Sequence, residues 1–412
     1  MRQNQPREAH SDIDPAYGAG SGTGQRQERR ALLALGFAGF GSSAMMRVCD
    51  PMLPALARDF DVTAGQASQT ISAYAIAYGI LQLIFGPLGD RYGKRRVVGI
   101  AALLCIVGNA LAVFAGTLDL LIVARALAGV AAAGIIPLSL AWIGDTVPYA
   151  QRQAALARYL TAILMGLIAG QWVAGVITDL WGWRWIFALL FVFFLAVGLA
   201  LSLDASVRRE AARPPSGGGY VHDMVDVLTR PWAVWLLVAV TLEGAFAFSA
   251  MAFLPTFMHD EYGFGISVSS GIVALYGVGG MVYSFGARKL LSRFSEEGMA
   301  ILGGLLLTAS WLMVAVLDRW EWVPPATVAA GIGYYTLHST LMTQATQMAP
   351  AARGTAMSLF AGCLFLGISI GVGSSGLVID HVSYRWVFAV CALGLGLLAG
   401  AFAYSLRRRG RR

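Results

Sequence analysis

Charged residues are scarce in this 412-residue sequence: only 13% of the residues are Asp, Glu, Lys or Arg, whereas 57% are hydrophobic. Soluble globular proteins carry about 25% charged and about 45–50% apolar residues. This composition excludes an ordinary soluble enzyme, a disordered chain and a nucleic-acid-binding domain. Cysteine is scarce too, and the four cysteines lie in apolar stretches without C-x-x-C spacing. We therefore expect neither a disulfide framework nor a zinc site.

Motifs that anchor common active sites are also missing. The sequence has no G-x-x-x-x-G-K-S/T loop to bind nucleotide phosphates and no H-E-x-x-H pattern to bind catalytic zinc. We expect no enzymatic activity, no cofactor and no metal. The lack of a phosphate loop also excludes an ATP-driven pump.

Twelve apolar stretches, each long enough to cross a bilayer as a helix, cover most of the chain. A membrane-spanning helix needs about 20 apolar residues, and lipid accepts only helices or closed barrels. These stretches are too long and too continuously apolar for barrel strands. We expect helices at 31–57, 67–88, 97–116, 118–144, 155–178, 184–203, 232–257, 266–288, 298–317, 323–347, 355–378 and 384–406.

Lysine and arginine are distributed unevenly between these helices. If the N-terminus is cytoplasmic, 24 of the 30 basic residues fall in cytoplasmic segments. Only Arg58, Arg184, Arg319 and Arg385 fall in outer segments. Since cytoplasmic loops are rich in Lys and Arg, we expect a bacterial cytoplasmic (inner) membrane protein with both termini in the cytoplasm. The net charge of +7 then reflects topology, and we expect no nucleic-acid partner.

Composition divides the chain into five parts. Residues 1–30 are polar and predict a disordered cytoplasmic tail, followed by a first span that remains as an uncleaved signal anchor. Residues 204–231 contain Arg, Pro, Ser and Gly and predict a cytoplasmic linker. The linker separates six-helix bundles at 31–203 and 232–406, and a basic cytoplasmic tail follows at 407–412.

The two halves of the sequence repeat with a shift of 201 residues. The shift superimposes Arg152, Gly166, Gly170, Gly175, Asp179, Arg184, Trp185 and Phe187 on Arg353, Gly367, Gly371, Gly376, Asp380, Arg385, Trp386 and Phe388. It also places Leu53, Pro54 and Asp59 on Leu254, Pro255 and Asp260. Six helices per repeat keep the two halves in the same orientation, which predicts a pseudo-twofold axis along the membrane normal. A site between such halves can open to either side, which is the architecture of alternating-access transport.

The segment after the second expected helix carries the clearest motif. It reads Gly86-Pro87-Leu88-Gly89-Asp90-Arg91-Tyr92-Gly93-Lys94-Arg95-Arg96. This resembles the G-x-L-G-D-R-x-G-R/K-R/K signature of the major facilitator superfamily at every fixed position. The resemblance implies an all-α membrane fold of twelve helices in two pseudo-twofold-related six-helix bundles. It also implies that Gly86, Gly89, Asp90, Arg91, Gly93, Lys94 and Arg95 form a cytoplasmic gate motif, in which Asp90 latches the two halves.

Two further motifs resemble members of this superfamily. Arg125 and Gly129 match the R-x-x-x-G of helix 4. The run Asp50-Pro51-Met52-Leu53-Pro54 matches the D-x-x-x-P of helix 1 in the twelve-helix drug:proton antiporters. The sequence departs from that group in helix 5, where Gln171 follows Gly170 in place of the usual proline.

Five ionisable residues fall inside the expected helices, where such groups are costly and mark transport pathways. They are Arg47, Asp50, Arg125, Glu243 and His338, and we expect proton coupling or substrate contact from them. By the resemblance, their helices 1, 4, 7 and 10 line the central cavity.

The partners of these five residues remain open. Asp50 is expected to pair with Arg47, with Arg125 or with both, unless these are purely structural ion pairs. Arg47, Asp50 and Pro54 have a spacing that places them on one helix face. Glu243 has no basic residue within four positions, so we expect it to carry the proton or contact the substrate. His338 could join it, or could merely bond to a hydroxyl.

The sequence as a whole predicts a secondary active transporter that works by alternating access. We expect a monomer in the lipid bilayer that exchanges protons for a small-molecule substrate and exports small, largely apolar compounds. A proton-coupled importer of an organic acid or sugar is an alternative, and so is a transporter-like membrane sensor.

Overall fold

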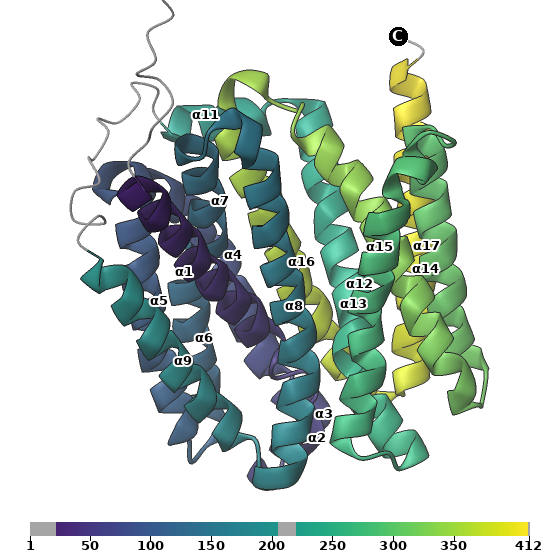
Figure 1. Ribbon diagram of the computed structural model, residues 1–412. Helices are drawn as coiled ribbons and strands as arrows, with labels where there is room; N and C mark the ends of the chain where they lie inside the picture. The colour runs from purple at the N-terminus through teal and green to yellow at the C-terminus, as the bar shows by residue number, and fades with distance from the viewer. Residues whose placement is uncertain (1–21, 205–219, 411–412) are drawn as a thin grey trace, which may run out of the picture.

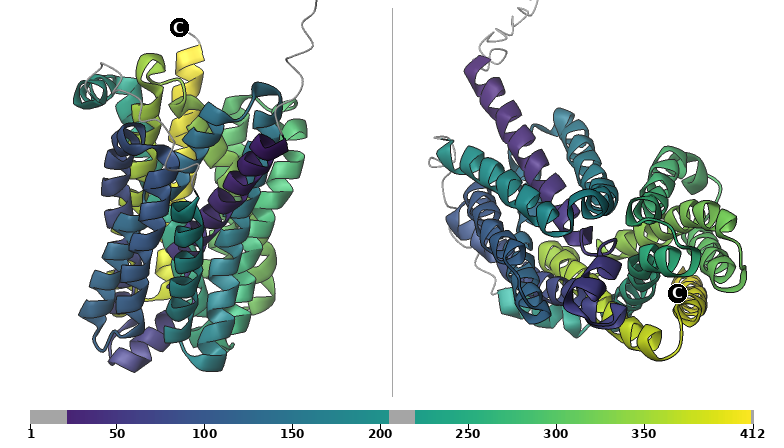
Figure 2. Two further views of the ribbon diagram at one scale, coloured as in Figure 1. Left: turned by 60° about the vertical axis from the view of Figure 1, so that its left-hand side comes forward. Right: turned by 90° about the horizontal axis from the view of Figure 1, so that it is seen from below.

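The long helices of the molecule stand side by side in a computed structural model that describes residues 22–204 and 220–410. Within these residues the chain forms helices and turns and no strand. The purple-to-teal helices of the first half and the green-to-yellow helices of the second occupy two sides of the molecule (Figure 1; Figure 2). Both ends of the described chain lie at the top of Figure 1, which we call the terminal face; the other end is the opposite face.

The helices of the first half alternate between these two faces. They are α1 (Gly22–Arg47), α2 (Leu53–Phe60), α3 (Ala64–Ala67), α4 (Gln69–Tyr92), α5 (Lys94–Val113), α6 (Leu118–Ala132), α7 (Ile135–Thr146), α8 (Tyr149–Trp181) and α9 (Arg184–Leu203).

The second half begins with a short helix at the terminal face. Its elements are α11 (Tyr220–Leu228), α12 (Pro231–Tyr262), α13 (Ile266–Leu291), α14 (Glu296–Val316), the 3-10 turn η2 (Trp320–Trp322), α15 (Val323–Ala345), the 3-10 turn η3 (Pro350–Ala352), α16 (Arg353–His381) and α17 (Tyr384–Gly410).

Every expected apolar stretch coincides with helix, but two stretches are divided. The stretch at 31–57 is broken between α1 and α2, and the one at 118–144 is broken at Ala133 and Gly134 between α6 and α7. Among the described residues, ten helices are long and apolar enough to cross a membrane. The helices α1 and α15 are long enough but not among these ten. α1 carries arginines near both ends, and α15 carries polar residues such as His338.

The segments outside the bundles hold more helix than expected. Residues 1–21, 205–219 and 411–412 of the two tails and the linker lie outside the described residues. The expectation of disorder was wrong for residues 22–30, which begin α1. Residues 407–410 of the expected basic tail continue α17. The linker contains α11, which packs against the bundle with its apolar side, where Val227 is buried.

Glycine contacts show the internal repeat in three dimensions. A Cβ atom on Gly166 or Gly170 of α8 would strike the α1 backbone at Phe40 and Ala44. A Cβ atom on Gly367 or Gly371 of α16 would strike the α12 backbone at Thr241 and Ala245, and every one of these four residues is displaced by 201 from its counterpart. The pairs α1–α8 and α12–α16 are therefore the same close packing repeated.

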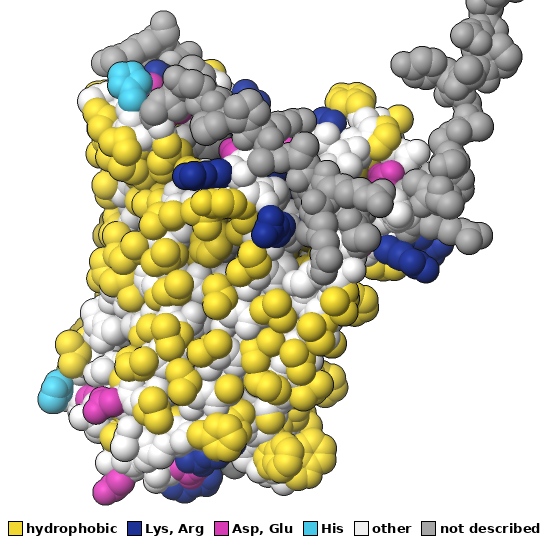
Figure 3. Space-filling view, turned by 90° about the vertical axis from the view of Figure 1, so that its left-hand side faces the viewer, with side chains coloured by type: hydrophobic (Ala, Val, Ile, Leu, Met, Phe, Trp, Pro, Cys, Tyr) yellow, Lys and Arg dark blue, Asp and Glu magenta, His cyan; other side chains and the backbone are white. Residues whose placement is uncertain are grey.

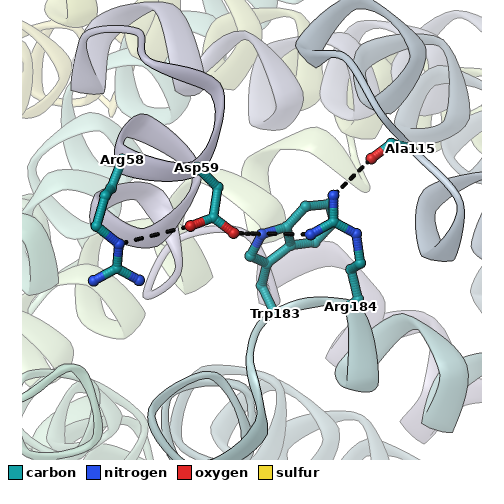
Figure 4. A network of polar contacts seen from close by, with 5 residues as sticks. All are labelled: Arg58, Asp59, Ala115, Trp183 and Arg184. Carbon is teal, nitrogen blue, oxygen red and sulfur yellow. Dashed lines mark hydrogen bonds and ion pairs between the residues drawn. The ribbon is translucent and has the colours of Figure 1, made fainter.

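A polar network at the opposite face is repeated as well. Asp59 accepts a hydrogen bond from Trp183 Nε1 (2.9 Å) and lies 3.8 Å from the guanidinium of Arg184, which donates to the Ala115 carbonyl at 2.9 Å (Figure 4). These contacts tie the end of the first span to the α5–α6 turn and to the start of α9.

The second half uses corresponding positions. Tyr384 donates to Asp260 at 2.7 Å, and Arg385 lies 2.6 Å from Asp318 and 3.5 Å from the Ala315 carbonyl. Trp183, Arg184 and Asp59 precede Tyr384, Arg385 and Asp260 by 201 residues. The hydrogen bond from the aromatic side chain to the aspartate is therefore repeated, while among the described residues the second arginine pairs with Asp318 and not with the repeated aspartate.

The outer surface matches a lipid environment. Hydrophobic side chains cover the middle of the face shown in Figure 3, and charged side chains lie towards its two ends. Large exposed hydrophobic residues include Leu104, Val192, Leu305 and Leu397. An apolar belt between two charged rims is what a protein that spans a bilayer presents to lipid and water.

Candidate functional site

The first membrane span is interrupted inside the bundle, where α1 ends at Arg47 and α2 begins at Leu53. Pro51 explains the break, because proline lacks a backbone N–H and disfavours helical geometry in the preceding residue, here Asp50. Asp50 therefore lies in a turn, with its backbone N–H 3.4 Å from the Arg47 carbonyl. Broken helices of this kind expose backbone polar groups and line binding sites in transporters.

Asp50 is fully buried and has two polar partners. Its Oδ2 forms an ion pair with Arg47 Nη2 and accepts a hydrogen bond from Gln171 Nε2 at 2.8 Å. Asp50 Oδ1 has no hydrogen-bond partner among the described residues. The expectation that Arg47, Asp50 and Pro54 share one helix face was wrong, because Pro54 lies in α2 beyond the break.

Arg125 of α6, one of the two expected partners of Asp50, makes other contacts. Its Nη2 donates to the Met45 carbonyl at 2.9 Å, and its guanidinium lies 4.3 Å above the Tyr74 ring. No ion pair joins Arg125 to Asp50 in the part of the chain that the structure describes. Since Met45 is in the last turn of α1, Arg125 caps the negative end of this interrupted helix.

Glu243 of α12 and His338 of α15 meet in the second half. His338 Nδ1 lies 2.8 Å from Glu243 Oε2, and Glu243 is fully buried. The other carboxylate oxygen, Oε1, has no hydrogen-bond partner among the described residues. The pair joins two helices, so a change in its protonation can change the contact between them.

Aromatic rings surround His338 and connect it with the first half. The Tyr334 ring stacks on His338 at 5.1 Å between centroids, and the Phe360 ring lies at 5.8 Å. Phe248 contacts Tyr334 edge to face at 5.4 Å, and the Arg47 guanidinium lies 5.2 Å from the Phe248 centroid. Arg47, Phe248 and Tyr334 thus connect the Asp50 pair with the Glu243 pair across the two halves.

The gate motif forms a charged cluster at the terminal face. Lys94 Nζ lies 3.1 Å from Asp90 and 2.5 Å from Asp145 of α7, and the Arg95 guanidinium lies 5.1 Å from the Trp142 ring. These contacts tie the α4–α5 turn to α7 inside the first half. The ion pair that the structure describes for Asp90 is therefore local and does not reach the second half.

The glycines of this motif differ in their surroundings. Gly93 has a φ of 91° between α4 and α5, a conformation that favours glycine. A Cβ atom on Gly89 would strike the Leu138 side chain of α7, whereas one on Gly86 would meet no atom of the described residues within 4 Å. Close helix approach therefore explains Gly89 but not Gly86.

Gln171, Phe248 and Tyr334 were not predicted as site residues. Gln171 had a signal, since it stands where the antiporter pattern has proline, and the structure uses its amide to hold Asp50. The two aromatic residues had only a weak signal, because aromatic side chains that suit an apolar ligand also face lipid. Among the described residues no group of three or more His, Cys, Asp or Glu side chains could hold a metal ion.

Comparisons with known proteins agree with this architecture. The family model described as Major Facilitator Superfamily matches residues 35–372. The MFS-type transporter YwfA of Bacillus subtilis (strain 168), described as uncharacterized, is 25% identical over 394 residues, which cover 90% of this chain and 91% of the relative.

Two solved structures share the fold. One is a bacterial homolog to the human lysosomal transporter Spinster, in an inward-facing and unoccupied conformation; its TM-score is 0.74 at 15% identity, covering 93% of this chain and 97% of that one. The other is the nucleoside transporter NupG, with a TM-score of 0.74 at 14% identity, covering 90% and 98%. Together with the family match, these likenesses and the repeated helix packing show that the chain belongs to the Major Facilitator Superfamily and is a secondary transporter embedded in a membrane.

Proposed function

We propose that this transporter couples protons to the export of small, largely apolar compounds. The contact between Glu243 and His338 carries the proposal, because it places two titratable groups 2.8 Å apart with the carboxylate fully buried. A buried carboxylate is costly unless it is paired, so proton binding and release here change the energy of the surrounding helices.

The surroundings of the pair support an apolar ligand. Tyr334, Phe360 and Phe248 enclose His338 and Arg47 with ring faces and edges. Small-molecule sites combine such apolar walls with a few convergent polar groups. Asp50 supplies a second buried carboxylate, one oxygen of which has no hydrogen-bond partner among the described residues, so substrate or a second proton can engage the first half as well.

Orientation and assembly follow from the same reasoning. We propose that the terminal face is cytoplasmic in a bacterial inner membrane, because described Lys- and Arg-rich segments such as 91–96, 288–293 and 407–409 lie on that side. Both titratable pairs and their connection through Phe248 lie within one chain, which supports action as a monomer. The export direction rests on the resemblance of Asp50–Pro54 to antiporters.

Transport direction can be tested in proteoliposomes with a panel of small apolar compounds. Proton antiport predicts that vesicles with an acidic interior accumulate substrate, because outward proton flow drives uptake into the vesicle. Accumulation only when the exterior is acidic would indicate proton symport and import. Saturable binding without net movement under either gradient would indicate a sensor.

For the gate motif we predict a substitution that lowers the transport rate but hardly changes the free energy of unfolding. Asp90→Asn should change the free energy of unfolding by about 1 kcal/mol or less, because the Asp90 side chain is 54% exposed. Initial transport rates should nevertheless fall severalfold, since the motif helps to set the populations of the two transport states. The matched control is Asp226→Asn, which also removes an exposed i,i+4 ion pair, with Arg230. Equal rates for both variants would contradict a gating role.

A further inference from the structure

At the opposite face, two aspartate side chains each accept hydrogen bonds from the other half of the molecule. Asp179 Oδ2, near the end of α8, accepts a hydrogen bond from the Ser267 backbone N–H at 2.6 Å. Asp380, near the end of α16, accepts hydrogen bonds from Thr63 Oγ1 at 2.7 Å and from the Gly65 backbone N–H at 3.0 Å. These contacts lie where α8 meets α13 and where α16 meets α3, at the lower end of Figure 1.

The two contacts are copies of each other. Asp179 and Asp380 are separated by the repeat distance of 201 residues, and each binds the first turn of a helix in the other half. Backbone N–H groups in the first turn have no partner within their helix, and the helix end carries partial positive charge. A carboxylate is therefore a strong partner for them, and the duplication argues against a chance contact.

A glycine one turn before each carboxylate brings the helices together. A Cβ atom on Gly175 would strike the Ser270 hydroxyl of α13, and one on Gly376 would lie 2.8 Å from Ser68 Oγ and 3.0 Å from the Gly65 backbone. Gly175 and Gly376 are also 201 residues apart. Each half therefore makes the same pair of contacts at this face: a glycine packs closely on the other half, and an aspartate four residues later accepts a hydrogen bond from the first turn of a helix there.

Nearer the terminal face, two glycines of these helices lack such contacts with the described residues. A Cβ atom on Gly86 of α4 or Gly286 of α13 would have no neighbour among the described residues within 4 Å. Asp179 and Asp380 make their contacts between the halves at the opposite face.

We propose that Asp179 and Asp380 are twin gating residues that hold the opposite face closed, and that each releases its helix start when this face opens. Both carboxylates are reachable from water, because Asp179 is exposed and Asp380 lines a pocket of about 370 Å³ beside Arg58, His259 and Tyr384. Water can therefore replace the hydrogen bonds during opening, which makes the closure reversible. This role depends on the transport cycle of the family and not on proton coupling.

Pulsed electron paramagnetic resonance on the full chain in lipid nanodiscs tests the proposal. Spin labels at Phe114→Cys and Val316→Cys report the separation of the halves at the opposite face, since both positions are exposed. Labels at Tyr149→Cys and Phe285→Cys report it near the terminal face.

The expected result is an opposite change in the two label pairs. A hydrogen bond to a charged group contributes enough to shift a two-state equilibrium about tenfold. Asp179→Asn with Asp380→Asn should therefore raise the population with wide separation at the opposite face by at least about tenfold, and narrow the terminal face. Asp119→Asn, an exposed acid at the start of α6 on the same face, is the matched control. Distances that stay at the parent values in the double variant would overturn the proposal.

Removing the donor instead of the acceptor gives a second test. Ser267→Pro deletes the N–H that Asp179 accepts at a first-turn position, where α2 already has Pro54. It should open the opposite face as Asp179→Asn does, and the two changes together should add nothing further. Additive effects would show that Asp179 does not act through this N–H.

A larger side chain at the glycine contact tests closure of the opposite face without changing any charge. Gly376→Leu should widen the opposite face, because its side chain would enter the space held by Ser68 and Gly65. Gly400→Leu is the control, since a Cβ there meets no described atom within 4 Å. A closed opposite face in Gly376→Leu would contradict the packing half of the proposal.

Discussion

Glu243→Gln is expected to abolish transport against a gradient while leaving binding of neutral ligands intact. Glutamine keeps the shape of the side chain and can still bond to His338, but it cannot gain or lose a proton. Coupled movement should therefore stop, and the affinity for ligand should lose its pH dependence. Ligand affinity measured in detergent between about pH 3 and about pH 9 covers the ordinary titration ranges of carboxyl and imidazole groups.

The matched control is Glu261→Gln, an identical change at an exposed position near the end of the same helix. It should keep both the transport rate and the pH profile of the parent protein. If Glu243→Gln keeps that pH profile, the proton is carried elsewhere, and Asp50 is the next residue to test.

Arg47→Met should destabilise the protein more than other single changes at the site. The substitution leaves the fully buried Asp50 with Gln171 as its remaining partner, and loss of one member of a buried ion pair costs about 3–5 kcal/mol. Adding Asp50→Asn should restore much of this stability, because asparagine is neutral and can still accept the hydrogen bond of Gln171. Thermal unfolding of the purified single and double variants in detergent measures both effects.

An exposed arginine is the control for this comparison. Arg58→Met removes a guanidinium whose side chain is 77% exposed, so it should leave the unfolding temperature near that of the parent. A double variant no more stable than Arg47→Met alone would show that Arg47 acts through packing on Phe248, and not through Asp50.

Sequence patterns predicted the bundle well because membrane helices obey a simple physical rule. Lipid requires long, apolar, internally hydrogen-bonded segments, so composition alone reveals them. The shift of 201 residues predicted two equivalent halves, and Gly166 and Gly367 contact the first long helix of their own bundles in the same way. The break after Arg47 was missed, although Pro51 was a visible reason to end the helix there.

The partners of the buried ionisable residues could not be read from sequence. Asp50 had two possible cations, and the choice depends on how α6 packs against the end of α1. The structure places Arg125 on the Met45 carbonyl and leaves Arg47 to Asp50. Glu243 has no basic residue within four positions, and the sequence left open whether His338 joins it or bonds to a hydroxyl; in the structure His338 contacts Glu243 from α15. Such contacts between helices come from tertiary packing and leave no local pattern.

Proton release on ligand binding tests most directly the proposal that the Glu243–His338 pair couples proton movement to substrate transport. Purified protein in weakly buffered detergent solution is mixed with a compound that it transports, and the pH change is recorded. The account predicts that the parent protein releases protons on binding and that Glu243→Gln binds without release. Equal proton release from both proteins, or binding by the parent protein without any release, would contradict it.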